Sequence, residues 1–135
     1  MKKILFLLAA AILLSGCEGK EKDELVGQLR LKFEKDSDLK DYKISPEDMS
    51  KCVAGKILKE IPGFPGSPNR KRFIAAYTKL VRVDPTEDFR PALEETKEVF
   101  GSEVKAHEAA GTITMSSFSC IGDMINQQPL QDGQR

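Results

Sequence analysis

The stretch SPEDMSKCVAGKILKEIPG, residues 45–63, decides the fold class. Ser45 offers a capping hydroxyl, and Pro46 occupies a first helical position, where its missing N–H costs nothing. Apolar residues follow, mostly three and four positions apart, until Pro62-Gly63 ends the pattern: Met49, Cys52, Val53, Ile57 and Ile61. This periodicity predicts an amphipathic helix with one buried face, and Cys52 lies on that face.

Two further helix starts repeat this chemistry along the chain. Ser67-Pro68 supplies a cap and a proline, and Asp84-Pro85-Thr86-Glu87 adds a glutamate at the capping-box position. The second helix carries the clearest apolar stripe, made by Phe73, Ile74, Tyr77, Leu80 and Val81. The third is expected to run from Pro85 to Phe100, with Gly101 closing it. Capping residues followed directly by proline are hard to explain in a strand.

The remaining segments complete an all-α bundle of about four to five helices. A short helix is expected over 103–110, stopped by Gly111, and another over 115–127, with Phe118, Ile121, Met124 and Ile125 on its buried side. Residues 25–33 fit either a helix (Leu25, Leu29, Phe33) or an alternating strand (Leu29, Leu31, Phe33). Of the two, the helix is favoured. Residues 34–43 are expected to form a linker or a frayed end.

The amino terminus has the organisation of an export signal. Lys2 and Lys3 precede an unbroken apolar run of 11 residues, Ile4 to Leu14. That run is well short of the roughly 20 residues that a membrane-spanning helix needs, and no second long apolar stretch follows. Residues 1–16 are therefore predicted to be a signal peptide.

The motif Leu14-Ser15-Gly16-Cys17 resembles the lipobox of bacterial lipoproteins at all four positions. The resemblance implies that the Cys17 sulfur receives a diacylglycerol thioether, that residues 1–16 are removed, and that the new amino group is acylated. Several acyl chains, at about 0.8 kcal/mol per buried methylene, anchor a protein firmly. Glu18 follows where enterobacterial sorting uses aspartate as the main inner-membrane retention signal. In a Gram-negative host this implies the outer membrane, facing the periplasm.

The exported chain is expected to have three parts. Residues 17–24 form the lipidated cysteine and a charged tether, residues 25–127 a single helical domain, and residues 128–135 a flexible polar tail. Without residues 1–16 the chain has 19 basic and 21 acidic residues, a formal net charge of −2. A nearly neutral charge argues against a nucleic-acid partner.

Two cysteines, Cys52 and Cys120, remain for the domain itself. In an oxidising exported compartment they predict one disulfide, between the first and last core helices. Closing so long a loop would stabilise the fold by roughly 4 kcal/mol on the chain-entropy model. A redox role would require the close C-x-x-C spacing, which the pair lacks.

Two features are candidates for partner contact. The second helix carries a basic face formed by Arg70, Lys71, Arg72, Lys79 and Arg82, which could touch anionic headgroups, glycan or an acidic partner. Such charges more often form a merely solvated face. The loop before this helix, IPGFPGSP, carries Phe64, which either is a recognition tip or, more commonly, folds back into the core.

The sequence contains no pattern that predicts catalysis, a metal or a cofactor. His107-Glu108-Ala109-Ala110-Gly111 begins like the zinc motif H-E-x-x-H but has Gly111 in place of the second ligand. We therefore expect a non-enzymatic, lipid-anchored envelope protein that binds or scaffolds another envelope protein or glycan. The alternative is a stress-protective, chaperone-like periplasmic protein, by analogy of architecture with small helical acid-stress chaperones that carry one long-range disulfide.

Overall fold

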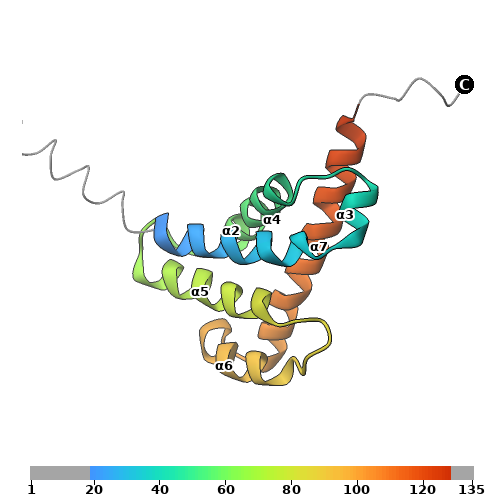
Figure 1. Ribbon diagram of the computed structural model, residues 1–135. Coiled ribbons are helices and arrows are strands. Elements are labelled where there is room, and N and C mark those ends of the chain that lie inside the picture. The colour runs from blue at the N-terminus through green and yellow to red at the C-terminus, as the bar shows by residue number, and fades with distance from the viewer. Residues whose placement is uncertain (1–18, 129–135) are drawn as a thin grey trace, which may run out of the picture.

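The computed structural model describes residues 19–128, and within this range it is all-helical, which confirms the predicted fold class. Six helices follow one another along the chain (Figure 1): α2 (Gly19–Glu34), α3 (Ser37–Asp41), α4 (Pro46–Glu60), α5 (Pro68–Arg82), α6 (Arg90–Phe100) and α7 (Glu103–Gln127). The predicted signal peptide, Cys17 and residues 129–135 lie outside the described residues.

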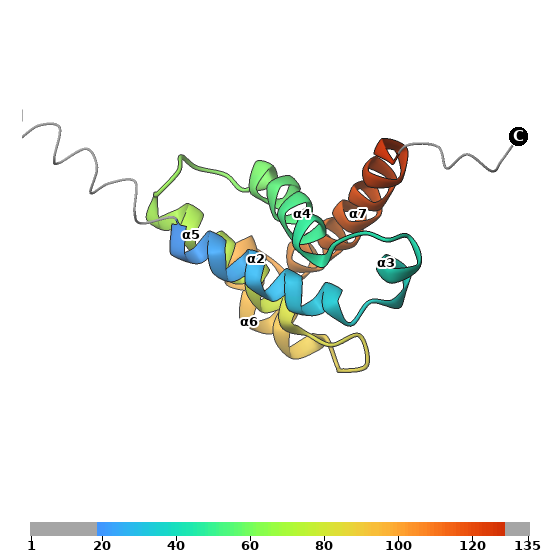
Figure 2. The same ribbon diagram turned by 45° about the horizontal axis from the view of Figure 1, so that its top comes forward.

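Helices α2, α4 and α5 pack around one part of the core, and α6 and α7 complete it. Helix α2 contacts both α4 and α5, whereas α7 contacts α4, α5 and α6. Figures 1 and 2 show α2 and α5 side by side and running in the same direction, with α7 crossing at the far end from their starts. The core is mostly aliphatic, as the absence of tryptophan suggests, with edge-to-face contacts from the Phe100 ring to Phe73 and Tyr77.

Residues 17–24 were expected to form the lipidated cysteine and a charged tether. Helix α2 begins at Gly19, so residues 19–24 are helical and this prediction is wrong for them. Glutamate and lysine have good helix propensity, and a helix needs only one apolar stripe to pack. Leu25 and Leu29 are fully buried and Phe33 is nearly so, whereas Leu31 is 48% exposed. The helical alternative for residues 25–33 is therefore confirmed.

The expected linker over residues 34–43 contains the one-turn helix α3. The Asp36 carboxylate accepts a hydrogen bond of 2.9 Å from the Asp38 N–H and caps this turn. Leu39 anchors the turn, since only 1% of its surface remains exposed. The connection is thus packed against the domain, although most of its other side chains face solvent.

The third predicted helix start is wrong by five residues, because α6 begins at Arg90 and not at Pro85. The Asp84 carboxylate accepts from the N–H and the hydroxyl of Thr86, and the Glu87 N–H donates to the Asp84 carbonyl, which closes a turn. A helix running from Pro85 through Pro91 would lack a backbone hydrogen bond at Pro91 and would clash with the carbonyl four residues earlier. Pro91 is instead accommodated in the first turn of α6.

The two short helices expected at the end of the chain are a single helix, α7, which runs through Gly111. An interior glycine weakens a helix by only about 1 kcal/mol relative to alanine. The buried residues are spaced alternately three and four apart across the glycine, and this spacing outweighs that cost: Ala106, Ala109, Ile113, Ser116 and Cys120. The predicted buried side of residues 115–127 is wrong for Phe118 and Ile125, which are 66% and 39% exposed.

Cys52 on α4 and Cys120 on α7 form a disulfide with a Cα–Cα distance of 6.0 Å. The bond joins two helices that also pack against each other. The sequence suggested that the helix with Cys52 is the first core helix. Helix α2 precedes it in the chain and also contributes buried residues, so α4 is not the first core helix. The disulfide links the middle of the domain to its last helix, across a sequence separation of 68 residues.

Candidate functional site

The loop from Ile61 to Ser67 presents Phe64 to solvent. Ile61 and Ser67 at its two ends are buried, whereas Phe64 is 74% exposed, the most exposed of the large apolar side chains in the described part of the chain. The expectation that Phe64 folds back into the core is therefore wrong. The loop instead exposes the Phe64 side chain at its tip, as the alternative prediction required.

The backbone of this loop is held in a defined conformation. The Ser67 N–H donates a hydrogen bond of 3.1 Å to the Phe64 carbonyl, and Pro65 and Gly66 occupy the two central positions of the resulting turn. Gly66 has a φ of 83°, which is typical of a type II turn with proline before glycine. Gly63 has a φ of 96°, and a Cβ there would approach the Ser67 hydroxyl oxygen at 3.0 Å. The exposure of Phe64 is thus built into a stiff loop.

Arg70 belongs to the structure of this loop and not to a free basic face. Its guanidinium donates hydrogen bonds of 2.7 Å to the Ile61 carbonyl and 2.9 Å to the Leu58 carbonyl. These are carbonyls at the end of α4, where helical partners run out. Arg70 thereby ties the carboxyl end of α4 to the first turn of α5.

The other predicted basic residues divide into two groups. Lys79 pairs with Glu95 at 3.1 Å, and Arg82 pairs with Glu24 of α2. Lys71 and Arg72, near the start of α5, form no ion pair or side-chain hydrogen bond with any residue of the range 19–128. Two of the five predicted basic residues therefore remain free to meet an external group.

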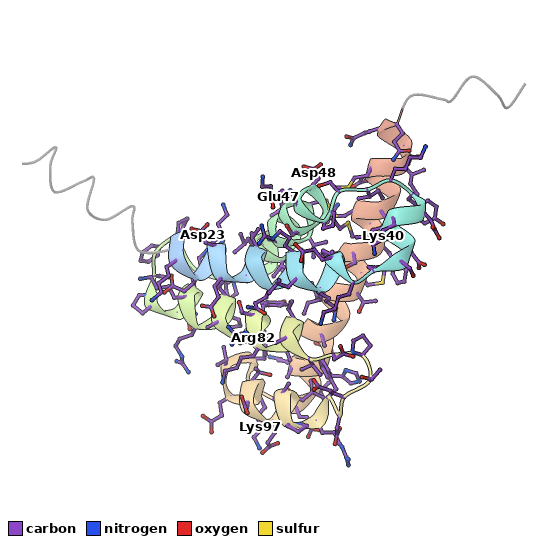
Figure 3. All side chains as sticks on the ribbon, viewed as in Figure 1. Asp23, Lys40, Glu47, Asp48, Arg82 and Lys97 are labelled. Carbon is purple, nitrogen blue, oxygen red and sulfur yellow. A yellow bond between two sulfur atoms is a disulfide. The ribbon has the colours of Figure 1, made fainter. Side chains whose placement is uncertain are left out.

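The exposed aromatic lies at the end of the molecule where α2 begins. Both Figures 1 and 2 place the α4–α5 loop, the start of α5 and the start of α2 together at this end, and Figure 3 labels Asp23 there. Lys20 and Lys22, in the first turn of α2, are exposed as well. We define the Phe64 end by its aromatic and its basic side chains: Lys20, Lys22, Phe64, Lys71 and Arg72. Glu21 also lies in this first turn of α2 and Asp23 follows it, so the charge there is mixed but predominantly basic.

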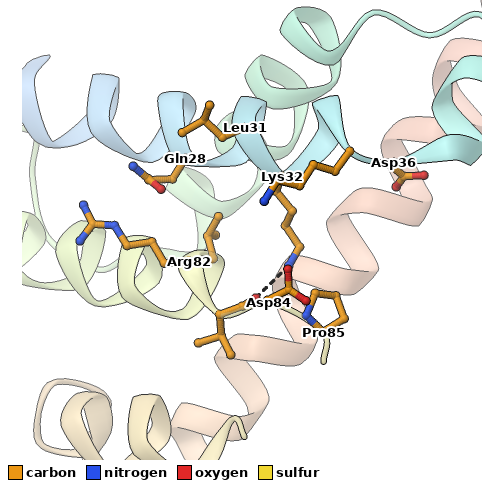
Figure 4. Close-up of a pocket in the computed structure, with 10 residues that line it drawn as sticks. Gln28, Leu31, Lys32, Asp36, Arg82, Asp84 and Pro85 are labelled. Carbon is orange, nitrogen blue, oxygen red and sulfur yellow. Dashed lines mark hydrogen bonds between the residues drawn. The ribbon is translucent and has the colours of Figure 1, made fainter. Parts of the chain in front are cut away.

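A groove of about 450 Å³ runs between the second half of α2 and the segment that follows α5 (Figure 4). Lys32 spans it, donating a hydrogen bond of 3.3 Å to the Val83 carbonyl. Leu31 and Pro85 contribute apolar surface. The groove is open to solvent, and its Arg82 side chain is already paired with Glu24.

Asp84 lines this groove, and its carboxyl group has a lowered pKa. Hydrogen bonds from the backbone N–H and the hydroxyl of Thr86 lower the pKa of Asp84 below its usual value, and the charges of Lys35 and Lys32 lower it further. The carboxylate is thus fixed in its charged form near neutral pH by its own turn. That role is structural, and it accounts for the shift without a ligand.

His107 is exposed on α7, and no ion pair joins it to Glu103 within residues 19–128. No group of three or more metal-ligating side chains comes together in this range. None of the described helices has the length and hydropathy required to cross a bilayer.

No family model, curated protein or solved structure matches this chain. The sequence left two alternatives for Phe64 and favoured the buried one, which the structure contradicts, and it missed a second exposed apolar set on α7. Val104 and Met115 are each 68% exposed, and Phe118 is 66% exposed. The signal was present in the sequence, because Val104, Gly111, Phe118 and Ile125 recur every seven residues.

Proposed function

We propose that this chain is a lipid-anchored protein of a bacterial cell envelope, fixed through Cys17, that acts without enzymatic chemistry as a binding or scaffolding module. The observation that carries the proposal is the motif Leu14-Ser15-Gly16-Cys17 placed immediately before a disulfide-stapled helical domain. In a host with two membranes we place it on the outer membrane, with the domain in the periplasm. Its partner is another envelope protein or glycan.

The early start of α2 supports a close approach of the domain to the membrane. Only Glu18 separates Cys17 from Gly19, the first residue of α2. Two peptide units span at most about 7 Å. A lipid on Cys17 would therefore hold the start of α2 against the headgroups, and not at the end of a flexible tether of seven residues.

The Phe64 end suits that position. An exposed aromatic on a stiff loop can insert at the boundary between headgroups and acyl chains, as apolar side chains of peripheral proteins do. Basic side chains near an anionic surface contribute about 1 kcal/mol each, so Lys20, Lys22, Lys71 and Arg72 would add to the lipid anchor. We expect the Phe64 end to face the bilayer and α7 to face away from it.

Fluorescence can test this orientation, because the chain has no tryptophan. A Phe64→Trp substitution introduces a single fluorophore at an exposed position, so it leaves the core unchanged. The lipoprotein is reconstituted in vesicles of phosphatidylethanolamine and phosphatidylglycerol with brominated acyl chains, which quench tryptophan within the bilayer. We expect quenching and a blue-shifted emission for Trp at position 64.

The matched control is Phe118→Trp, which replaces an equally accessible phenylalanine on α7. Its emission should be unaffected by brominated lipid. A chain that lacks residues 1–17 and carries Phe64→Trp should remain unquenched and should not bind the vesicles. Equal quenching at both positions would contradict the orientation, and vesicle binding by the chain without residues 1–17 as tight as that of the lipoprotein would contradict the anchor.

A second function, protection of unfolded proteins under stress, is favoured by one observation. Val104, Met115 and Phe118 expose about two-thirds of their surfaces along one helix, and such apolar surface could hold unfolded chains. This function predicts that the protein suppresses aggregation of unrelated proteins after acid or heat treatment. Absence of suppression, with no reversible gain of apolar exposure, rejects it.

A further inference from the structure

The outer face of α7 carries an apolar stripe that no part of the described chain covers. All its members are exposed, and after a first interval of seven residues they recur at alternating spacings of four and three: Val104, Gly111, Met115, Phe118, Gly122 and Ile125. Glu108 is the one charged residue within the stripe. The spacing is that of a helix face that packs lengthwise against another helix.

This stripe lies on the opposite side of α7 from the core-facing residues Ala106, Ile113 and Cys120. Its two glycines form notches, because a Cβ at Gly111 or Gly122 would meet no heavy atom within 4 Å. Large side chains stand between the notches. The stripe therefore offers both knobs and holes for a partner helix.

We infer that the occupant is α7 of a second copy, packed antiparallel about a two-fold axis near Met115. In this register Phe118 of each copy faces Gly111 of the other, and Val104 faces Ile125. Both pairings occur in one register because the midpoint of Gly111 and Phe118 and the midpoint of Val104 and Ile125 are the same point, next to Met115. A two-fold contact must satisfy this self-complementarity, in which residue i meets j while j meets i.

Charge favours the antiparallel arrangement over the parallel one. Parallel pairing would oppose two Glu108 carboxylates and two Phe118 rings. Antiparallel pairing brings Lys105 of one copy near Asp123 of the other, on the same side of the stripe. Asp123 also pairs with Lys56 of its own chain at 3.0 Å, and its exposed carboxylate has room for a second cation.

The size of the contact indicates a weak dimer. The large side chains of the stripe leave on the order of 400 Å² of apolar surface per copy, about half of what each partner buries in a standard interface. Such a pair forms when copies are concentrated, as they are within one membrane. The register does not depend on the anchor, so the inference stands apart from the proposed function.

Photocrosslinking in cells that express the full-length chain tests the inference. A benzoylphenylalanine probe replaces Phe118, and the matched probe replaces Tyr42, an aromatic of 49% exposure that lies outside α7. The probe at position 118 should give a covalent dimer whose adduct maps to Gly111 or its neighbours. The probe at position 42 should give none. Crosslinking of the purified protein at high concentration, without a membrane, repeats the test independently of lipid on Cys17.

A Gly111→Leu substitution fills the notch and should lower the dimer yield by about tenfold or more. Glu98→Leu adds the same side chain at an exposed position of α6 and should leave the yield unchanged. A monomer alone, an adduct with a different protein, or a dimer linked outside the Gly111 turn would overturn the inference. So would an unchanged yield in Gly111→Leu.

Discussion

The guanidinium of Arg70 donates a 2.7 Å hydrogen bond to the backbone carbonyl of Ile61, across the loop that exposes Phe64. A second bond reaches Leu58, so one side chain satisfies two carbonyls at the end of α4. Pro62 cannot continue the helix, and these carbonyls would otherwise depend on water. Arg70 is thus the residue that fixes the Phe64 loop to the helix before it.

Replacing Arg70 by methionine should lower the free energy of unfolding by about 1.5–3 kcal/mol, the usual range for hydrogen bonds to charged groups. Urea denaturation followed by circular dichroism measures the change. The control is Arg72→Met, two residues away, which removes an exposed cation with no partner among the described residues. That variant should change stability by less than about 0.5 kcal/mol. Equal effects would show that Arg70 does not have this role.

The two leucines of α2 distinguish a buried helical stripe from an alternating strand. Leu29→Ala empties a fully buried site and should cost about 2–5 kcal/mol. Leu31→Ala removes the same atoms from a side chain that is 48% exposed, and it should cost well under 1 kcal/mol. Thermal and urea unfolding of both variants provide the comparison. Similar losses at the two positions would argue for the strand-like burial that the sequence left open.

The disulfide makes a third prediction. Substituting both Cys52 and Cys120 by alanine opens a loop of 68 residues and should lower the free energy of unfolding by roughly 4 kcal/mol. The intact protein should lose a similar amount when a reductant is added, whereas the double variant should not respond to it. A reductant without effect on the intact protein would show that the two thiols are not joined.

Asp84 makes the stability of the domain depend on pH. Its pKa in the folded protein lies below the ordinary value of 3.8, chiefly because Thr86 donates two hydrogen bonds to the carboxylate. Its contribution is therefore fully present above the pKa of the unfolded chain, and it is lost as the pH falls through the lower folded value. Asp84→Asn keeps the shape but removes the charge.

The stability difference between the wild type and Asp84→Asn should accordingly be largest near pH 7 and shrink below about pH 4. Urea titrations at several pH values measure it. Asp41→Asn, at an exposed aspartate without a hydrogen-bond partner in the described chain, serves as the control for general charge effects. A difference that grows on acidification would contradict the assignment.

Helix content and most of the buried stripes could be predicted from local chemistry, and the disulfide pairing from the presence of only two cysteines in the domain. Ser45, Ser67 and the prolines that follow them fix two helix starts because a cap and a proline act within one turn. The errors concern competition between neighbouring signals. At Asp84 the capping residues are present, but Pro91 prevents the helix from running through them. Gly111 weakens the helix only slightly, and the buried residues on both sides of it stabilise one continuous helix.

The surface was harder to predict than the core, for a physical reason. Whether Arg70 meets solvent or a carbonyl depends on where α4 ends relative to α5, which no local pattern encodes. Phe64 was expected to be buried because aromatic residues usually are, yet the two left-handed glycines of its loop turn it outward. The seven-residue recurrence of the stripe on α7 is present in the sequence, but dividing residues 103–127 into two short helices at Gly111 concealed it.

We propose above all that acyl chains on Cys17 hold the domain in an envelope membrane. Mass spectrometry of the amino-terminal peptide from the membrane-extracted protein tests it most directly, with a Cys17→Ser chain as the control. We expect the peptide to begin at Cys17 and to carry a diacylglyceryl group and an amide-linked acyl chain, and we expect the control to lack both. An unmodified peptide, or one that retains Leu14-Ser15-Gly16 before an unacylated Cys17, would contradict it.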